Sequence, residues 1–366
     1  MGQLCSIKSG KSDTVDAVED GAYAFFDRSR KIKKSSRYLF DCEALIIPGE
    51  GKEFLPKYFS GKFDLHQRAY ALFDFSDRVD ITFLYYFLHH SRDYFPRVAV
   101  GATVKSLRLR HFEQLPVLLT SLTEQRRIVG ILDEAFEGIA TAKANAEKNF
   151  QNARDLLDSH LQSIFTQHAP GWQQRTLEEI ATTFGRGKSK HRPRNAPHLY
   201  GGKYPFIQTG DIRNADHIIT EYSQTYSEAG LAQSKLWPKG TVCITIAANI
   251  AETGILGFDA CFPDSVIGVV ANPKEANVGF IEYLLQSFKA RLQALGKGSA
   301  QANINMGTFE NERFPFPSVT EQEQIVAKLD DLREETERLS TIYQHKLAAL
   351  EALKKSLLHQ AFTGSL

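Results

Sequence analysis

Two long stretches of the chain combine regularly spaced apolar residues with an absence of proline. They span 123–166 and 320–362, and each opens with Thr-Glu-Gln, whose hydroxyl can cap the free N–H groups of a helix N-terminus. A helix of this length extends about 65 Å at 1.5 Å per residue. The pattern therefore predicts two long helices, over 121–168 and 319–366.

Apolar positions recur every three or four residues along the second helix, as they do in a coiled coil. Its expected pairing residues are Leu332, Leu339, Tyr343, Leu350 and Leu353. Many matching positions of the first helix are alanine, and its large pairing residues are Leu132, Ile139 and Leu156. Two separate, solvated helices are the alternative, but long helices with an apolar stripe need a partner. We therefore expect an antiparallel coiled-coil pair.

The two helices belong to an internal repeat of the whole chain. The sequence SLTEQRRIVGILD at 121–133 recurs as SVTEQEQIVAKLD at 318–330, which lies 197 positions later. The same offset aligns the first copy without a gap from residue 83 to residue 166. Nearer the start the offset is 177, because Gly10-Lys11-Ser12 matches Gly187-Lys188-Ser189. The first copy is shorter there, and we expect its globular domain to be shortened at the N-terminus.

The segments 1–120 and 169–318 differ in character from the helices. They contain short β-like runs, such as those at 44–47 and 266–270, which are separated by Gly, Pro and Asn. The expected fold class is α+β. Two globular mixed α/β domains would be separated by two long antiparallel coiled-coil helices, with a pseudo-two-fold internal repeat.

Charge is unevenly distributed along the chain. The 366 residues include 44 Lys and Arg against 43 Asp and Glu, so the chain is not a histone-like polyelectrolyte. The globular segments carry 33 basic and 28 acidic residues, whereas the helical segments carry 11 and 15. No run approaches the roughly 18 apolar residues of a membrane span, and residues 1–10 lack a signal-peptide core, so we expect a cytoplasmic protein. Four scattered cysteines without a CxxC pair argue against a disulfide framework and a zinc site.

The sequence contains no recognisable catalytic motif. Gly-Lys-Ser occurs twice, but the glycine that a phosphate-binding loop requires five residues earlier is replaced by Cys5 and Thr182. The chain has no His-Glu-x-x-His, no Gly-x-Ser-x-Gly and no adenine-methyltransferase tetrapeptide. We therefore expect a chain that is not an enzyme.

Two groups of residues are candidates for DNA binding: the basic runs of the globular segments, and residues near the Gly-rich turns that could reach bases. Lys and Arg neutralise phosphates, Arg or Lys suits guanine, and Asn or Gln suits adenine. In the first segment the candidates are Lys11, Arg30, Lys31, Lys33, Lys34, His66, Gln67, Arg68, Lys105 and Arg108. In the second segment they are Lys188, Lys190, Arg192, Arg194, Gln208, Arg213, Gln301, Asn303 and Asn305. For any single residue, a solvated charged surface is the alternative.

The duplicated helix start Thr-Glu-Gln-x-x-Ile-Val-x-x-Leu-Asp resembles that of the specificity subunits of Type I restriction–modification enzymes. The sequence LKKSLLHQAFTG at 353–364, the domain opening LEEI at 177–180 and TGDI at 209–212 are also typical of that family. The resemblance covers essentially the whole chain, and the helix motifs are specific because they occur in duplicate.

This resemblance implies that 1–120 and 169–318 are target-recognition domains, each reading one half of a split, asymmetric sequence in double-stranded DNA. The helices would fix the unread spacer and bind two modification (methyltransferase) subunits, to which restriction subunits can be added. The chain itself would bind no metal or cofactor. S-adenosylmethionine, and ATP with Mg²⁺ for restriction, would belong to the partner subunits, and no membrane is involved.

Two other functions are compatible with parts of the sequence. A non-catalytic coiled-coil scaffold whose globular ends bind proteins would share the helices but show no salt-dependent affinity for duplex DNA. A stand-alone nuclease or nucleotidase would need catalytic residues that the sequence does not supply.

Overall fold

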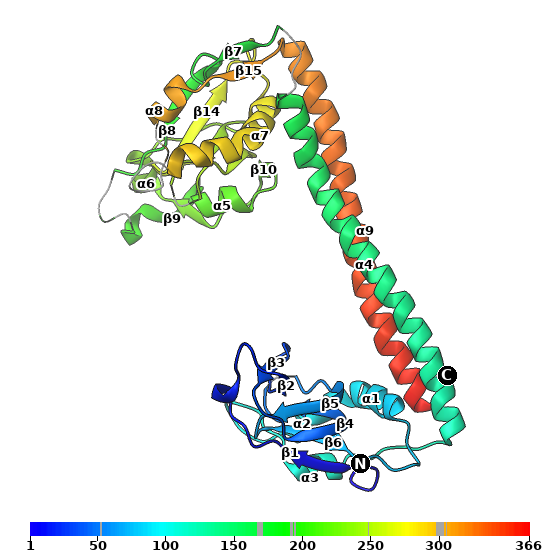
Figure 1. Ribbon diagram of the computed structural model, residues 1–366. Coiled ribbons are helices and arrows are strands. Elements are labelled where there is room, and N and C mark those ends of the chain that lie inside the picture. The colour runs from blue at the N-terminus through cyan, green and yellow to red at the C-terminus, as the bar shows by residue number, and fades with distance from the viewer. Residues whose placement is uncertain are drawn as a thin grey trace. The chain divides into compact units, whose positions relative to one another are not determined.

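The computed structural model describes residues 1–51, 53–166, 171–190, 193, 195–247, 249–297, 304 and 306–366. The chain divides into two compact units, and each long helix contributes one part of its length to each unit (Figure 1). Unit 1 consists of Met1–Lys148 and Tyr343–Leu366, and unit 2 consists of Asn149–Ile342.

Unit 1 is built on a six-stranded sheet of strand order β1-β6-β4-β5-β2-β3. Neighbouring strands are antiparallel except for β2 and β5, which pair in parallel. The strands are β1 (Ser6–Ser9), β2 (Tyr23–Phe26), β3 (Lys33–Ser35), β4 (Phe40–Pro48), β5 (Lys57–Leu65) and β6 (Ala69–Phe73). The helices are η1 (Thr14–Asp16), α1 (Ile81–His90), η2 (Ser91–Asp93), α2 (Tyr94–Val98) and α3 (Leu109–Glu113).

Alternation along β4 divides its apolar side chains between the two faces of this sheet. Leu45 and Ile47 belong to a buried cluster that also contains residues of α1, α2 and α3. Ala44 and Ile46 belong to a separate cluster that is centred on Phe63 and contains no helix residue. The helices therefore cover one face of the sheet.

Unit 2 is built on a five-stranded sheet of strand order β10-β13-β12-β14-β8, in which only β10 and β13 are parallel. These strands are β8 (Ala181–Arg186), β10 (Ile218–Ile219), β12 (Val242–Thr245), β13 (Thr253–Leu256) and β14 (Val266–Ala271). Two smaller antiparallel pairs join β9 (Tyr200–Phe206) to β11 (Gln224–Tyr226), and β7 (Gln173–Arg175) to β15 (Phe314–Phe316). The helices are η3 (Pro197–Leu199), α5 (Thr209–Asn214), α6 (Glu228–Ala232), α7 (Val278–Lys297) and α8 (Met306–Asn311).

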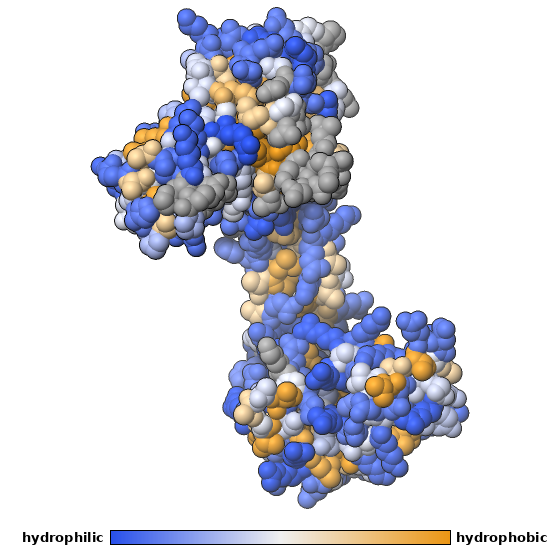
Figure 2. Space-filling view, turned by 90° about the vertical axis from the view of Figure 1, so that its left-hand side faces the viewer, coloured by the Kyte–Doolittle hydropathy of each residue, from blue (hydrophilic) through white to orange (hydrophobic). Residues whose placement is uncertain are grey.

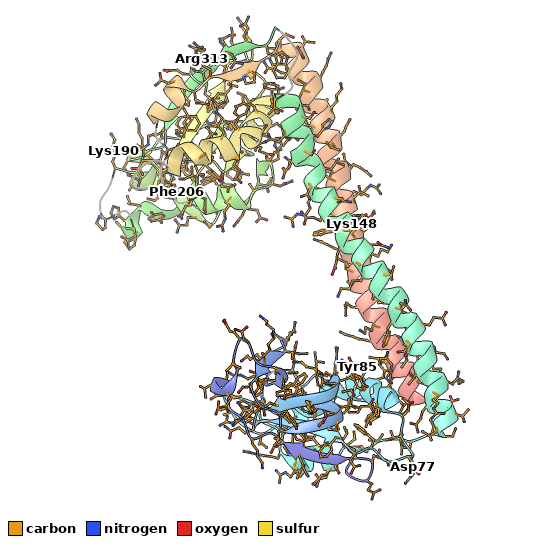
Figure 3. All side chains as sticks on the ribbon, in the orientation of Figure 1. Asp77, Tyr85, Lys148, Lys190, Phe206 and Arg313 are labelled. Carbon is orange, nitrogen blue, oxygen red and sulfur yellow. The ribbon has the colours of Figure 1, made fainter. Side chains whose placement is uncertain are left out.

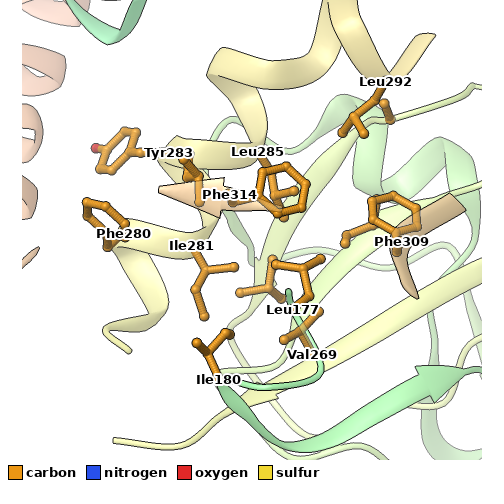
Figure 4. Close-up of a cluster of buried hydrophobic side chains, with 14 of the residues drawn as sticks. Leu177, Ile180, Val269, Phe280, Ile281, Tyr283, Leu285, Leu292, Phe309 and Phe314 are labelled. Carbon is orange, nitrogen blue, oxygen red and sulfur yellow. The ribbon is translucent and has the colours of Figure 1, made fainter. Parts of the chain in front are cut away.

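The main core of unit 2 lies between α7 and the sheet (Figure 4). Phe280, Ile281 and Leu285 of α7 are fully buried against Val269 of β14 and Phe314 of β15. Both units therefore place one principal helix on a mixed sheet, which is the α+β architecture that the sequence predicts.

The two long helices are α4 (Leu122–Thr166) and α9 (Val319–Thr363), each of 45 residues. Their first and last residues are related by the repeat offset of 197 at both ends. In unit 1, Ile128 and Leu132 near the start of α4 pack with Leu358 and Ala361 near the end of α9. In unit 2, Leu161 near the end of α4 and Leu329 near the start of α9 share one core. Within each unit the helices therefore run antiparallel.

The register of the helix pair differs from the expected one toward the ends of both helices. Leu132 and Ile139 are buried, and Leu332, Leu339, Tyr343 and Leu350 are partly buried. By contrast, Leu156 and Leu353 are 46% and 47% exposed. Leu157, next to Leu156, and Leu357, about one turn after Leu353, pack into the apolar clusters instead. An α-helix drifts by about 20° per heptad relative to a 3.5-residue repeat, so the seam of α4, assigned with constant spacing, has slipped by one position at Leu156.

The repeat is also visible in individual contacts. The side-chain amide of Gln125 accepts from the backbone N–H of Asp80 and donates to the carbonyls of Arg78 and Thr120. Gln322 makes the three equivalent bonds in unit 2, to Asn277, Glu275 and Pro317. Both glutamines are 0% exposed and sit in the first turn of α4 and α9. Each long helix is thus attached to its globular domain by the same buried amide.

Candidate nucleic-acid interface

Three loops of unit 1 meet at one surface and bring together candidates that are far apart in the sequence. The backbone N–H of Gly49 donates to the carbonyl of Arg68 at 2.7 Å, and the N–H of Leu107 donates to the carbonyl of Gly49 at 2.7 Å. A Cβ at Gly49 would stand 2.3 Å from the carbonyl oxygen of Arg68, so the close approach requires glycine. The loops flank two adjoining hollows of about 260 and 280 Å³. The predicted residues that line them are His66, Gln67, Arg68 and Arg108.

The three consecutive candidates at 66–68 differ in what holds them. Gln67 Nε2 donates to Asp13 Oδ2 at 2.9 Å, and His66 Nε2 lies 3.6 Å from Asp13 Oδ1. Arg68 Nη1 donates to Glu50 Oε1 at 2.6 Å, while 61% of its side chain remains exposed. The pKa of Asp13 is lowered mainly by the backbone N–H of Thr14, and by His66 and Gln67 to a lesser degree. Two of the three side chains are therefore directed to one carboxylate.

Four further candidate cations of unit 1, at 30–34, lie on the edge strand β3 or just before it, whereas Lys11 follows β1, and Lys105 and Arg108 precede α3. Arg30 pairs with Glu53 at 2.6 Å, and both are largely exposed. Lys33 pairs at 2.6 Å with Asp27, whose side chain is 4% exposed. The other candidates are exposed and form no ion pair with a described residue, namely Lys11, Lys31, Lys34, Lys105 and Arg108. The polar surface of unit 1 is interrupted by scattered hydrophobic residues (Figure 2).

In unit 2 a basic group lies just beyond the end of β8. Lys188 and Lys190 are exposed, and Lys190 projects at the periphery of the unit (Figure 3). Lys235, which sequence reasoning did not single out, joins them because Ser234 Oγ donates to the carbonyl of Lys188 at 2.8 Å. Lys188, Lys190 and Lys235 form no ion pair with any residue that the structure describes.

Lys235 is held over an aromatic ring. Its Nζ lies 3.6 Å from the ring centroid of Trp237, a fully buried side chain whose ring also stacks on that of Phe262. Burial lowers the pKa of Lys235, and the neighbouring charge of Lys188 lowers it further. Lys235 stands apart from the basic runs in the sequence, so only its tertiary contact with Trp237 identifies it.

The other candidates of unit 2 are dispersed. Gln208 is the N-cap residue of α5, and its backbone N–H donates to Asp211 Oδ2 in the first turn of that helix at 2.8 Å. Arg213 is exposed on α5 and donates to Asn249 Oδ1 at 3.4 Å. Five candidates lie outside the described residues: Arg192, Arg194, Gln301, Asn303 and Asn305.

No group of three His, Cys, Asp or Glu side chains in the described part of the chain is arranged to hold a metal ion. None of the described helices combines the length and the hydrophobicity that crossing a membrane requires.

Comparison with known sequences points to one family. Residues 1–148 and 170–349 match the Type I restriction modification DNA specificity domain. The chain is 22% identical to the Type I restriction enzyme EcoDI specificity subunit of Escherichia coli, over all of this chain and 87% of that protein. It is also 22% identical to the EcoKI specificity subunit of Escherichia coli K12, over 74% of this chain and 61% of that protein.

Solved structures share the fold. The HsdS subunit from Thermoanaerobacter tengcongensis superposes with a TM-score of 0.62 at 16% identity, covering 100% of this chain and 96% of that one. A chain from a study of complex assembly and conformational transition of the type I R-M system superposes with a TM-score of 0.75 at 17% identity, covering 100% and 97%.

Proposed function

The chain belongs to the Type I restriction modification DNA specificity family, and from that premise we propose how its two domains act in a restriction–modification complex. It is a specificity subunit with two target-recognition domains, one in each repeat. Each domain reads one half of a bipartite, asymmetric sequence in double-stranded DNA. The observation that carries this proposal is that Gln67 and Arg68 of one loop meet Arg108 of another around one hollow in unit 1.

The same groups supply affinity and specificity in different ways. Exposed lysines such as Lys34 and Lys188 neutralise phosphates, which gives binding that is independent of sequence and weakened by salt. Arginine in a shaped hollow can instead address the edge of a base. The net surplus of basic residues in the globular segments is small, so tight binding is expected only within the assembled complex.

The chain directs chemistry that other subunits perform. We propose that two modification (methyltransferase) subunits bind α4 and α9 and supply S-adenosylmethionine, and that restriction subunits supply ATP and Mg²⁺. The chain itself is proposed to be non-catalytic and to bind no cofactor. We propose that α4 and α9 fix the length of the spacer between the half-sites. The antiparallel pairing of these helices within each unit supports this role.

Methylome sequencing of cells that express this chain with its modification subunits tests the proposal. We expect one bipartite motif whose two halves are separated by an unread spacer of fixed length. Inserting one heptad into each helix, at facing positions, should change the spacer and leave both half-sites intact. A contiguous motif, or methylation that does not depend on this chain, would reject the proposal in favour of a scaffold that binds proteins.

A further inference from the structure

Among the candidate arginines of unit 1, Arg68 is the one held by a largely buried carboxylate. Its Nη1 donates to Glu50 Oε1 at 2.6 Å, and no described residue accepts from its Nε or Nη2. These two nitrogens form the side of the guanidinium that donates two parallel hydrogen bonds. One side of the Arg68 guanidinium is therefore anchored, the other has no partner among the described residues, and the side chain lines both hollows.

Glu50 is itself fixed in place. Its side chain is only 15% exposed, and the same Oε1 accepts a 3.1 Å hydrogen bond from Ser106 Oγ. Glu50 and Ser106 also form an isolated antiparallel β-bridge, which ties the loop after β4 to the loop before α3. A carboxylate that is largely buried and bonded in this way orients its partner, whereas the exposed Arg30–Glu53 pair leaves both side chains free to move.

The neighbours of Arg68 are less suited to reading a base. Bidentate recognition of adenine by glutamine needs both its amide nitrogen and its amide oxygen, and Asp13 already accepts from one of the two N–H groups of Gln67 Nε2 and fixes the direction of that amide. His66 accepts the backbone N–H of Arg68 through Nδ1 at 3.1 Å and faces Asp13 with its other nitrogen. Arg108 lines the same hollow but has no ion-pair partner among the described residues to orient it.

We propose that Arg68 is a base-specifying residue of the first recognition domain and that it reads a guanine, with Glu50 as the residue that positions it. The free Nε and Nη2 would donate to O6 and N7 of guanine in the major groove, which is the preferred contact of arginine with a base. Arg108 then contributes phosphate neutralisation without base preference. This inference rests on the proposed function of the chain as a DNA specificity subunit.

The test uses the full chain in complex with its modification subunits, S-adenosylmethionine and a library of duplexes randomised in both half-sites. Wild type should require a G·C pair at one position of one half-site. In Arg68→Ala, discrimination at that position should fall by about 5- to 150-fold, because one bidentate contact is lost. Arg68→Lys should lose part of this discrimination, because lysine can still donate to guanine but lacks the rigid pair of donors, while its salt dependence stays unchanged because the charge remains.

Two further variants separate positioning from charge. Glu50→Gln keeps an acceptor for Arg68 and Ser106 but removes the negative charge, so it should lower discrimination partially and at the same base pair. Arg108→Ala should weaken binding to all duplexes alike and reduce the slope of log K against log salt by about 0.9, without changing the motif.

The second half-site provides the internal control, because its reading depends on unit 2 and shows that each variant complex is folded. An unchanged first half-site in Arg68→Ala, or an equal loss at every position, would overturn the inference. A wild-type complex that methylates no bipartite motif would instead overturn the proposed function, so the two failures are distinguishable.

Discussion

The hydroxyl of Tyr283 donates a 2.7 Å hydrogen bond to the carboxylate of Asp330 and joins α7 to α9. The equivalent residues of the first repeat, Tyr86 and Asp133, make the same bond between α1 and α4. The repeat has thus retained not only the buried glutamine of each long helix but also a second, specific contact between the helix and its domain.

The surroundings of this shared bond differ between the units. In unit 2, Arg333 Nε donates to the hydroxyl of Tyr283 at 3.1 Å, and Arg333 Nη1 pairs with Asp216 at 2.8 Å. In unit 1 the position of Arg333 is taken by Phe136, whose ring packs on Tyr86 at 5.3 Å between centroids. The junction is ionic in one unit and aromatic in the other.

Removing the shared hydroxyl should therefore cost more in unit 2. Tyr283→Phe should lower the free energy of unfolding by about 1.5–3 kcal/mol, because two bonds to charged partners are lost and Arg333 is 11% exposed. Tyr86→Phe should cost about 0.5–1.5 kcal/mol, because Asp133 is exposed to water. Both tryptophans of the chain, Trp172 and Trp237, lie in unit 2. Urea denaturation followed by tryptophan fluorescence therefore reports the unfolding of unit 2, and far-UV circular dichroism reports the unfolding of both units. A larger loss of stability in Tyr86→Phe than in Tyr283→Phe would contradict this prediction.

Substituting the buried glutamine of α9 should also destabilise unit 2. Gln322→Glu keeps an acceptor for the N–H of Asn277 but cannot donate to the two carbonyls, and it places a charge in a fully buried position. We expect a loss of at least about 2 kcal/mol in the unfolding of unit 2, measured by tryptophan fluorescence in urea. Gln324→Glu is the matched control, because Gln324 is exposed and lies two residues further along the same helix, and it should change stability little.

The junction of unit 2 should respond to pH. A hydrogen bond with Asp216 raises the pKa of Glu337 to about 7, with burial and the charge of Glu334 adding to the effect and Arg333 opposing it. A carboxyl whose pKa is raised on folding stabilises the fold fully below its unfolded pKa, near 4.5, and loses that contribution as pH rises through 7.

Glu337→Gln removes this titration while keeping a neutral donor to Asp216. The thermal midpoint of unit 2, followed by tryptophan fluorescence from pH 5 to pH 8, should therefore fall less steeply with pH in the variant than in wild type. Parallel pH profiles of the two proteins would show that Glu337 does not share a proton with Asp216.

At Lys235, a substitution can separate the contribution of the ammonium charge to DNA binding from the packing of the side chain on Trp237. Lys235→Met keeps an apolar cover over Trp237 but removes the ammonium, so thermal stability should change little. If Lys235 contacts a phosphate, the variant complex should bind specific and non-specific duplexes more weakly and lose about 0.9 from its salt slope. Lys274→Met, at an exposed position of unit 2, should leave both properties unchanged. A stability loss without a change in salt slope would assign Lys235 to packing alone.

The parts of the fold that local sequence specifies were predictable. The spacing of apolar residues and the lack of proline fix α4 and α9 because helix formation depends on near neighbours. The buried run 44–47 marks the centre of β4, but β5 escapes prediction, since lysines and Gly61 interrupt its apolar pattern and its order comes from pairing with β4. The exposure of Leu156 depends on cumulative helix twist, which a count of spacings does not include.

The candidate site was predictable as a set of residues but not as an arrangement. Gly-rich turns and basic runs indicated where His66, Gln67 and Arg68 lie along the chain. Which of these side chains is free to contact a ligand depends on their bonds to Asp13 and Glu50. No motif or spacing in the sequence indicates that these two acids lie beside them. Long-range contacts of this kind appear only once the three loops are brought together by the sheet.

The core of unit 1 is completed by a segment that the ribosome makes after the whole of unit 2. Phe83, Ile128 and Leu132 are covered by Leu358 and Ala361 of α9, which belong to the same cluster. A nascent chain that has passed Lys148 therefore carries an uncovered apolar surface until α9 emerges. Translation imposes an order of assembly on this protein in which the first domain begun is the last one finished.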